Sequence, residues 1–462
     1  MLIKSSSPDE LPDCSSHSSK PLVITPAKPT PNHTLHLSNL DDQPFLRFSI
    51  KYLYLFKKSV DADALKRSLA LALVAYYPLA GRLRVCSSND HKLEVDCNGD
   101  GAVFVEASME STADEVLEIV NKKPNKSWRK LLHRVDGATS FIDIPPLVVQ
   151  VTYLKCGGMI LSTAISHCLC DGIGTSQFLH AWAYLAANQD ADLDPYYAFH
   201  SRRALSPRNP PRVEFDHLAY YNRTCESDCG YNLSKWLHSQ PLVPSSLVFT
   251  AEDILQLKKR CSPSIKCTAF EVLASHTWRC WVESLALPMS LNVKLLFSIN
   301  VRQKMADDIP KGYYGNAFVL GSAATTVKEL VMNSNLHQGV SLVQAAKTAA
   351  SSCECVKSLI DLLEDHERVK TDLRGSLVIS QWSKLGLEEL DFGGGKCMHM
   401  GALASDVCCL FLPVVGQKDS IRVLVSMPES VVEKFEDSMK GSFLAKKEDS
   451  KSGKHCWMDE YF

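Results

Sequence analysis

Hydrophobic and polar positions in the first part of the chain predict a strand followed by a helix. Residues 44–56, PFLRFSIKYLYLF, are rich in aromatic and β-branched side chains and partly alternate, as a β-strand does. Beyond them, leucines recur at the four-residue spacing that lines one face of a helix: Leu65, Leu69 and Leu73. Asp61 or Asp63 can cap the start of this helix.

Two apolar segments further along predict a β-hairpin. Residues 145–154 and 158–166 have the composition of short strands, and the pair Gly157-Gly158 lies where the turn is expected. The second strand ends at the sequence SHCLCDG, residues 166–172. The pattern therefore places His167 at the end of a strand.

A helix is expected directly after this sequence. Phe178, Leu179, Trp182 and Leu185 share one helical face, and Thr175 or Ser176 can cap its start. Gly172 and Gly174 give the backbone freedom to turn between strand and helix.

The second half of the chain repeats the mixture of elements, with a helix over 267–284 and strands over 293–301 and 421–428. A proline- and arginine-rich stretch, 201–215, has the composition of a linker between two nearly equal halves. We expect the following segments: a disordered arm at 1–20, a first domain at 21–200, a linker at 201–220, a second domain at 221–445 and a polar tail at 446–462.

Composition indicates a globular protein. The chain has 462 residues, of which 45% are hydrophobic, but charged or small polar residues interrupt every apolar stretch before it could span a membrane. The N-terminus lacks the apolar core of a signal peptide, and the last residues match no retention signal, so a cytoplasmic location is expected.

Charge and cysteine content exclude other classes of function. The net charge is −2 and the densest basic run is Lys258–Arg260, which is too short for a nucleic-acid surface, although a small phosphorylated ligand could use it. The 17 cysteines are scattered and odd in number, as in a protein with reduced thiols. Neither Cys225/Cys229 nor Cys353/Cys355 has zinc-type partners, so no metal site is expected.

The sequence SHCLCDG raises the question of a catalytic base, a metal site or chance. His167 and Asp171 are separated by three residues, and one such H-x-x-x-D pattern is expected by chance about once in a chain of this composition. A second occurs from His455 to Asp459, in a polar tail with no strand before it. Context therefore favours His167 and marks His455 as coincidence.

Eight short motifs in order make the chain resemble the plant BAHD acyltransferases, which move acyl groups from coenzyme A thioesters to alcohols or amines. They are LSNLD (37–41), YYPLAGRL (76–83), SHCLCDG (166–172), RNPPR (208–212), FEVLASHTWR (270–279), NVRQKM (300–305), GYYGN (312–316) and DFGGGK (391–396). The resemblance implies an α/β fold of two similar domains like chloramphenicol acetyltransferase, each a mixed sheet flanked by helices. It also implies a crossover loop and a tunnel between the domains.

The same resemblance assigns roles to individual residues. His167 would be the general base for the acceptor alcohol. Asp171, the other residue of the catalytic motif, would pair with Arg302 to hold the loop, and Gly172 would permit its turn. Cys168 and Cys170 are interpreted as small packing residues rather than nucleophiles.

Ligand-binding residues follow less directly from the resemblance. Ser380 and Trp382 match the segment beside the pantetheine arm, with Gln381 as a departure, and Lys258 would contact the phosphates of coenzyme A. The structural loop comprises Asp391, Phe392, Gly393 and Gly395, where Gly394 replaces the tryptophan of the family. That replacement would cost about 1 to 3 kcal/mol of local order.

These features predict a monomeric acyl-CoA-dependent O-acyltransferase with no metal and no bound cofactor, whose co-substrate is acyl-CoA. The N-terminal sequence is most like the branch that transfers hydroxycinnamoyl groups to ω-hydroxy fatty acids or fatty alcohols. An acetyl or benzoyl transferase acting on a terpenoid or other alcohol is an alternative. A non-catalytic partner in lipid elongation is another, suggested by the altered DFGGG loop and opposed by the retained His167, Asp171 and Arg302.

Overall fold

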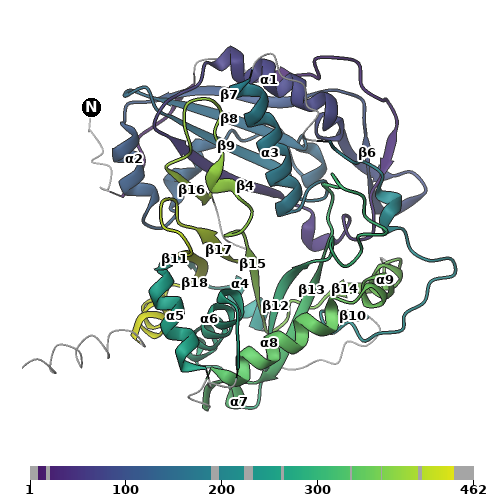
Figure 1. Cartoon of the computed structure of the whole chain (residues 1–462), viewed down its shortest axis with the longest axis vertical. Helices are drawn as coiled ribbons and strands as arrows, with labels where there is room; N and C mark the ends of the chain where they lie inside the picture. Colours follow the sequence, from purple (N-terminus) through teal and green to yellow (C-terminus); the bar gives the residue numbers. More distant parts are fainter. Residues whose placement is uncertain are drawn as a thin grey trace, which may run out of the picture.

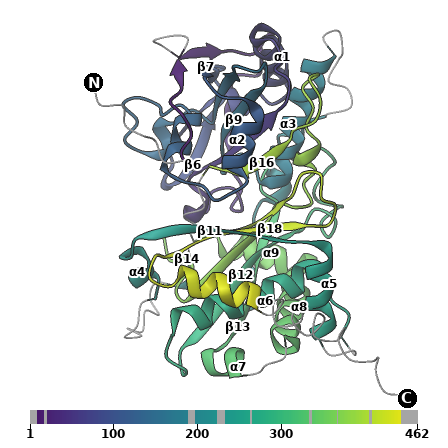
Figure 2. The same ribbon diagram turned by 90° about the vertical axis from the view of Figure 1, so that its left-hand side faces the viewer.

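Two mixed sheets with helices against them form two parts that are stacked along the long axis of the molecule (Figures 1 and 2). The computed structural model describes residues 9–16, 21–188, 197–222, 233–261, 265–332, 336–365, 367–403 and 408–441. The predicted α/β class, with two mixed sheets, is confirmed.

The first sheet has the strand order β1-β7-β8-β9-β4-β16, and β2 also pairs with β7. Only β7 and β8 run parallel to each other in this sheet. Its strands are β1 (Ser15–Ser16), β2 (Leu22–Ile24), β4 (Ser49–Phe56), β7 (Ala102–Met109), β8 (Leu147–Leu154), β9 (Met159–Ser166) and β16 (His399–Ala402).

Three helices cover the two faces of this sheet. Helices α1 (Ala62–Ala75) and α3 (Gly172–Ala187) share one apolar core with β4 and β9, whereas α2 (Ala113–Val120) packs against the other face of the same strands. A separate three-stranded sheet consists of β3 (Thr34–His36), β6 (Asn89–Asp96) and β5 (Arg82–Cys86). The predicted leucine face of α1 is fully buried.

The second sheet has the order β11-β18-β17-β15-β12-β13, with parallel pairing on both sides of β15. Its strands are β11 (Leu242–Phe249), β12 (Asn292–Asn300), β13 (Phe318–Thr326), β15 (Ser376–Gln381), β17 (Cys409–Pro413) and β18 (Ile421–Pro428). The helices of this part are α4 (Leu233–His238), α5 (Ala251–Arg260), α6 (Ala269–Leu285), α7 (Val327–Met332), α8 (His337–Ala350) and α9 (Cys353–Leu362). The short strands β10 (Tyr220–Asn222) and β14 (Val369–Thr371) pair apart from this sheet.

The predicted hairpin agrees with the structure, but the strand predicted over 44–56 is shorter than expected. β8 and β9 form the expected antiparallel pair, and Gly157 in their turn has a φ of 83°. The strand predicted over 44–56 begins only at Ser49, because Pro44–Leu46 form a 3-10 turn. Proline at its start favours such a turn, since its φ is fixed and it has no N–H to donate to a sheet.

The chain does not divide between the sheets as simply as the predicted linker at 201–220 implies. β16 comes from the second half of the sequence but pairs with β4 and completes the edge of the first sheet. Within the arm expected to be disordered, Leu11 is buried and β1 pairs with β7. The predicted polar tail, with His455, lies outside the described residues.

No helix among these described residues combines the length and the apolar character needed to cross a bilayer.

Candidate active site

A cavity of about 230 Å³ lies between the two parts of the molecule, and His167 lines it. Side chains from both halves form its walls, among them Phe48 and Ile173 from the first and Phe318 from the second. Most of the wall is apolar. The predicted enclosure of His167 between two domains therefore has a counterpart in the structure.

The position of His167 follows from the end of β9. Its backbone N–H donates to the carbonyl of Phe48 at 2.9 Å, which continues the pairing of β9 with the neighbouring chain beyond Ser166. The imidazole lies edge-on to Phe48, with ring centres 5.2 Å apart, and 6.0 Å from the ring of Phe318. Nδ1 is buried and has no hydrogen-bond partner within the described part of the chain.

Burial lowers the pKa of His167. The cause is the loss of hydration of the charged imidazolium, which the more distant carboxylate of Asp171 only partly offsets. The ring is therefore neutral at pH 7, and a neutral imidazole can accept a proton from a hydroxyl group.

Asp171 lines the same cavity, and its carboxylate pairs with Arg302, the partner that the resemblance implies. Arg302 Nη1 donates to Oδ2 at 2.8 Å and Nη2 donates to Oδ1 at 3.0 Å, a two-pronged contact. The N–H of Ala317 donates to Oδ2 at 3.1 Å. Because Arg302 follows β12 and Ala317 precedes β13, this carboxylate joins the loop that carries His167 to the second half.

The same carboxylate caps helix α3, which corrects the predicted cap at Thr175 or Ser176. Asp171 Oδ1 accepts from the N–H of Gly174 at 2.9 Å, so the helix begins at Gly172. Neither Gly172 nor Gly174 has a positive φ, so backbone freedom is not their role. A Cβ at Gly174 would lie 1.8 Å from the carbonyl oxygen of Tyr314, so close packing against the second half requires glycine.

Asn316 holds the backbone carbonyl of His167 and is itself held by Asp41, and neither residue was assigned a role from the sequence. Asn316 Nδ2 donates to that carbonyl at 2.7 Å and to Asp41 Oδ1 at 2.9 Å. Asp41 is fully buried and also accepts from the hydroxyl of Ser38 at 2.6 Å. Both lie in motifs noted above, LSNLD and GYYGN, but only the structure shows that the motifs meet.

Arg202 enters the same network from the predicted linker. Its side chain is buried, lies 3.4 Å from Asp41 Oδ2 and donates from Nη2 to the carbonyl of Leu169 at 3.0 Å. The guanidinium lies 4.7 Å from the ring centre of Tyr314. Although it lies in the predicted linker, Arg202 supports the loop that carries His167.

The predicted ligand-binding residues fall in two places. Ser380 and Trp382 line the cavity with His167, and Trp382 Nε1 donates to Ser380 Oγ at 3.1 Å. Trp382 also stacks on Tyr52 of β4, with ring centres 4.3 Å apart. Lys258 lies in the last turn of α5 and does not line this cavity.

The predicted structural loop lies shortly before β16, and none of its residues 391–395 lines the cavity. Asp391 Oδ1 accepts from the N–H groups of Gly393 at 2.8 Å and Gly395 at 2.9 Å. Phe392 is fully buried and packs edge-on to Trp182 of α3, with ring centres 5.0 Å apart. The loop therefore keeps its anchor through Phe392 in the absence of the tryptophan.

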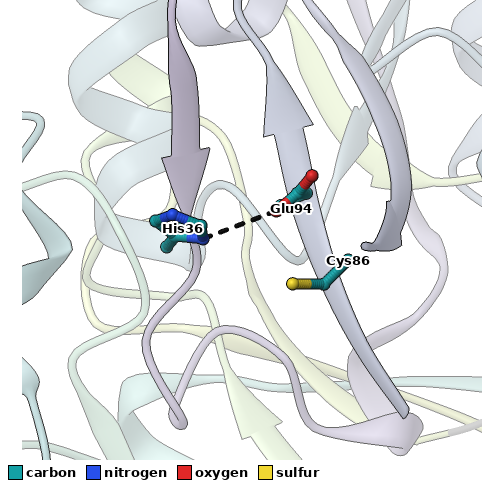
Figure 3. Close-up of side chains that lie close together, drawn as sticks. All are labelled: His36, Cys86 and Glu94. Atoms are coloured by element: carbon teal, nitrogen blue, oxygen red, sulfur yellow. Dashed lines mark ion pairs between the residues drawn. The ribbon is translucent and has the colours of Figure 1, made fainter. Parts of the chain in front are cut away.

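The two cysteines of the SHCLCDG motif and one group of potential metal donors do not line this cavity. Cys168 and Cys170 are fully buried, in agreement with a packing role. In the part of the chain that the structure describes, one group of potential metal donors occurs, His36, Cys86 and Glu94, on the three-stranded sheet (Figure 3). Arg84 Nε donates to Glu94 Oε1 at 2.8 Å and already balances its charge, and none of the three donors lines the cavity. Cys225 and Cys229 lie outside the described residues.

Comparisons with solved structures show the same fold. Vinorine synthase superposes with a TM-score of 0.70 at 19% identity, over 93% of this chain and 98% of that one. F. graminearum TRI101 complexed with ethyl coenzyme A superposes with a TM-score of 0.75 at 15% identity, over 90% and 99%.

Comparisons of sequence find relatives that are about one third identical over most of their length. Fatty alcohol:caffeoyl-CoA acyltransferase of Arabidopsis thaliana is 33% identical over 428 residues, 91% of this chain and 97% of the relative. Omega-hydroxypalmitate O-feruloyl transferase of the same plant is 33% identical over 434 residues, 91% and 92%. Benzyl alcohol O-benzoyltransferase of Petunia hybrida is 32% identical over 432 residues, 90% of this chain and 91% of the relative.

The family model described as "Transferase family" matches residues 18–441, which include the whole of the cavity and its supporting network. The family model, the relatives and the fold agree: this chain belongs to the plant BAHD acyltransferases.

Proposed function

We propose that this enzyme transfers a hydroxycinnamoyl group from coenzyme A to the hydroxyl of a long-chain alcohol, with His167 as the general base. The observation that carries the proposal is a neutral imidazole in an apolar cavity between the two halves. Acyl-CoA is a co-substrate here, and the mechanism requires no bound cofactor.

His167 would act through Nε2, since Nδ1 is buried and faces no partner in the described part of the chain. Nε2 takes the proton of the acceptor hydroxyl as the oxygen attacks the thioester carbonyl. The tetrahedral intermediate then expels the coenzyme A thiolate, and the imidazolium returns its proton to that sulfur. The products are an ester and free coenzyme A, and the ring is neutral again.

Asp171 acts through position in this proposal. Its two oxygens are occupied by Arg302, Gly174 and Ala317, so it does not orient the imidazole as a triad carboxylate would. Asn316 holds the backbone carbonyl of His167, and Arg202 holds that of Leu169 in the same loop. The apolar wall keeps most water from the thioester, which disfavours hydrolysis.

The substrate classes come from the relatives and from the character of the cavity. The relatives named above act on fatty alcohols and omega-hydroxypalmitate with caffeoyl and feruloyl donors. Phe45, Leu46 and Leu373 line the cavity and suit a hydrocarbon chain. The benzyl alcohol O-benzoyltransferase relative supports the second candidate, benzoyl or acetyl transfer to a smaller alcohol.

Ester formation by the purified full-length chain tests the proposal. We would assay feruloyl-, coumaroyl-, benzoyl- and acetyl-CoA against hexadecanol, 16-hydroxypalmitate, hexanol and benzyl alcohol, and identify products by mass spectrometry. His167→Ala should lower kcat at least about 100-fold without changing the unfolding temperature. His91→Ala, at an exposed position of β6 that does not line the cavity, is the control and should keep activity.

The pH dependence provides a second test of the base. Because the pKa of His167 is lowered, the imidazole stays neutral below the ordinary histidine pKa, so kcat/KM should begin to fall only below about pH 6.5. Full activity of His167→Ala contradicts the assignment of the base. Absence of any ester from a folded wild-type protein favours the non-catalytic partner.

A further inference from the structure

A second cavity, of about 110 Å³, lies beside the reaction cavity. Segment 215–220 forms one side of it, and β13, α8 and α9 form the rest. Small side chains from α8 line it, Ala346, Ala349 and Ala350, together with Cys355 of α9. Nothing in the mechanism above uses this space.

The two cavities meet at Leu320. Phe318, Leu320 and Ser322 point to one face of β13, because side chains alternate along a strand. Phe318 and Leu320 line the reaction cavity, whereas Leu320 and Ser322 line the second one. At about 3.3 Å per residue, this row extends about 13 Å away from His167.

The material between the cavities is apolar. Leu46, Ala219, Leu296, Phe318 and Leu320 form one buried cluster, and Leu373 and Val378 pack against it. Leu320 is 7% exposed and is the one described residue that lines both cavities. Ser322 Oγ is buried without a partner within the described residues, which leaves a single weakly polar atom along the path.

The charge of Asp216 in the second cavity distinguishes acceptors by the group at the end of their hydrocarbon chain. Asp216 lines the second cavity, and so does its neighbour His217. The Nε2 atom of His217 lies at hydrogen-bond distance, 3.0 Å, from Ser358 Oγ. Burial lowers the pKa of His217, so it adds no positive charge at pH 7. A carboxylate at the end of an acceptor would meet the like charge of Asp216, an exposed residue, and the apolar side chains of Phe215 and Leu218.

We infer that the second cavity receives the hydrocarbon chain of the acceptor, past Leu320, and that it favours a long primary alcohol with a neutral end. This inference rests on the proposed function and narrows its acceptor class to fatty alcohols. It makes the α8 alanines determinants of chain length.

Chain-length selectivity is the first test. Ala346→Phe fills the second cavity from α8 and should lower the ratio of kcat/KM for hexadecanol to that for hexanol at least ten-fold. Ala345→Phe, the exposed neighbour that does not line the cavity, should leave the ratio unchanged. Hexadecanol should also have a higher kcat/KM than 16-hydroxypalmitate in the unaltered enzyme.

Thiol protection is the second test and does not depend on catalysis. Hexadecanol should slow the alkylation of Cys355 by iodoacetamide at least five-fold, measured by peptide mass spectrometry, whereas hexanol should not. The exposed thiol of Cys156 is the internal control.

The outcomes separate the inference from the proposed function. An unchanged ratio in Ala346→Phe, unprotected Cys355 or preference for 16-hydroxypalmitate overturns the inference while His167 remains the base. Protection of Cys355 without ester formation supports the binding site and overturns the proposed function instead.

Discussion

At the scale of single residues, Asp171 connects the two halves of the enzyme. One carboxylate caps α3 through Gly174, binds the guanidinium of Arg302 and accepts from Ala317. Its side chain is 7% exposed and that of Arg302 is 16% exposed, so water screens the pair poorly. Removal of either partner leaves the other charge buried without its counterpart.

Substitution of Asp171 should therefore reduce stability and activity together. We expect Asp171→Ala to lower the free energy of unfolding by about 3 to 5 kcal/mol in urea denaturation, because a buried guanidinium loses its partner. Asp171→Asn should cost less, since asparagine can still cap the helix. A double-mutant cycle with Asp171→Ala, Arg302→Ala and the variant that carries both substitutions measures the interaction of the two side chains. Additive losses in that cycle would show that the two side chains do not stabilise each other.

At the scale of elements, the loop 391–396 shows how a motif survives the loss of its largest residue. Gly393 and Gly395 have φ values of 103° and 105°, which only glycine adopts without strain. Asp391 binds the N–H groups of both, and buried Phe392 fixes the loop to α3. Gly394 lies between them, and its Cβ would come within 3.0 Å of the carbonyl oxygen of Lys58.

Restoring the family tryptophan should consequently not improve this enzyme. We expect Gly394→Trp to destabilise it by about 1 to 3 kcal/mol, since the backbone of Lys58 must move to admit the side chain. Gly393→Ala is the comparison variant and should also destabilise, through its positive φ. Thermal unfolding checks both, and a higher unfolding temperature for Gly394→Trp would contradict the argument from packing.

The elements themselves were predictable where a pattern is local. The hairpin of β8 and β9 and the leucine face of α1 follow from alternation and helical spacing alone. The start of α3 did not follow from a local pattern, because Asp171 is the N-cap residue and lies four residues before Thr175. Several residues in this stretch can cap a helix, and contacts with Arg302 and Ala317 select among them.

At the scale of the whole molecule, buried histidines in both halves make folding sensitive to acid. Burial lowers the pKa of His200 to about 4, of His276 to about 4 and of His399 to about 3. They lie directly before the predicted linker, in α6 and in β16. Each resists protonation when folded and accepts it readily when unfolded.

The free energy of unfolding should therefore fall as the pH drops below about 6.5. The unfolded chain binds protons first, so the stability of the neutral forms is complete above pH 6.5 and is lost toward the folded pKa values. At pH 5 each of the three histidines would cost roughly 2 kcal/mol. Asp42, whose pKa burial raises to about 6, acts with the opposite sign but is a single group.

Urea denaturation at pH 7.5 and pH 5.0 measures this difference. His276→Gln should reduce the dependence of the free energy of unfolding on pH, because glutamine does not titrate. Its amide can still donate to the carbonyl of Met439, which lies 3.1 Å from the histidine Nε2, so the folded state keeps this contact. Equal free energies of unfolding of the unaltered enzyme at both pH values would contradict the prediction.

The sequence by itself determined the fold class, the strand that ends at His167 and, through its ordered motifs, the family and the Asp171–Arg302 pair. These depend on periodicity and on short motifs, which are properties of neighbouring residues. Only the tertiary structure decided that Asp41, Arg202 and Asn316 support the loop that carries His167, that β16 closes the first sheet, and that a second cavity adjoins the first at Leu320. Those features need contacts between segments far apart in the sequence, by 33 residues for Arg202 and Leu169 and by 275 for Asp41 and Asn316. Such contacts are set by how the two sheets pack rather than by any local pattern.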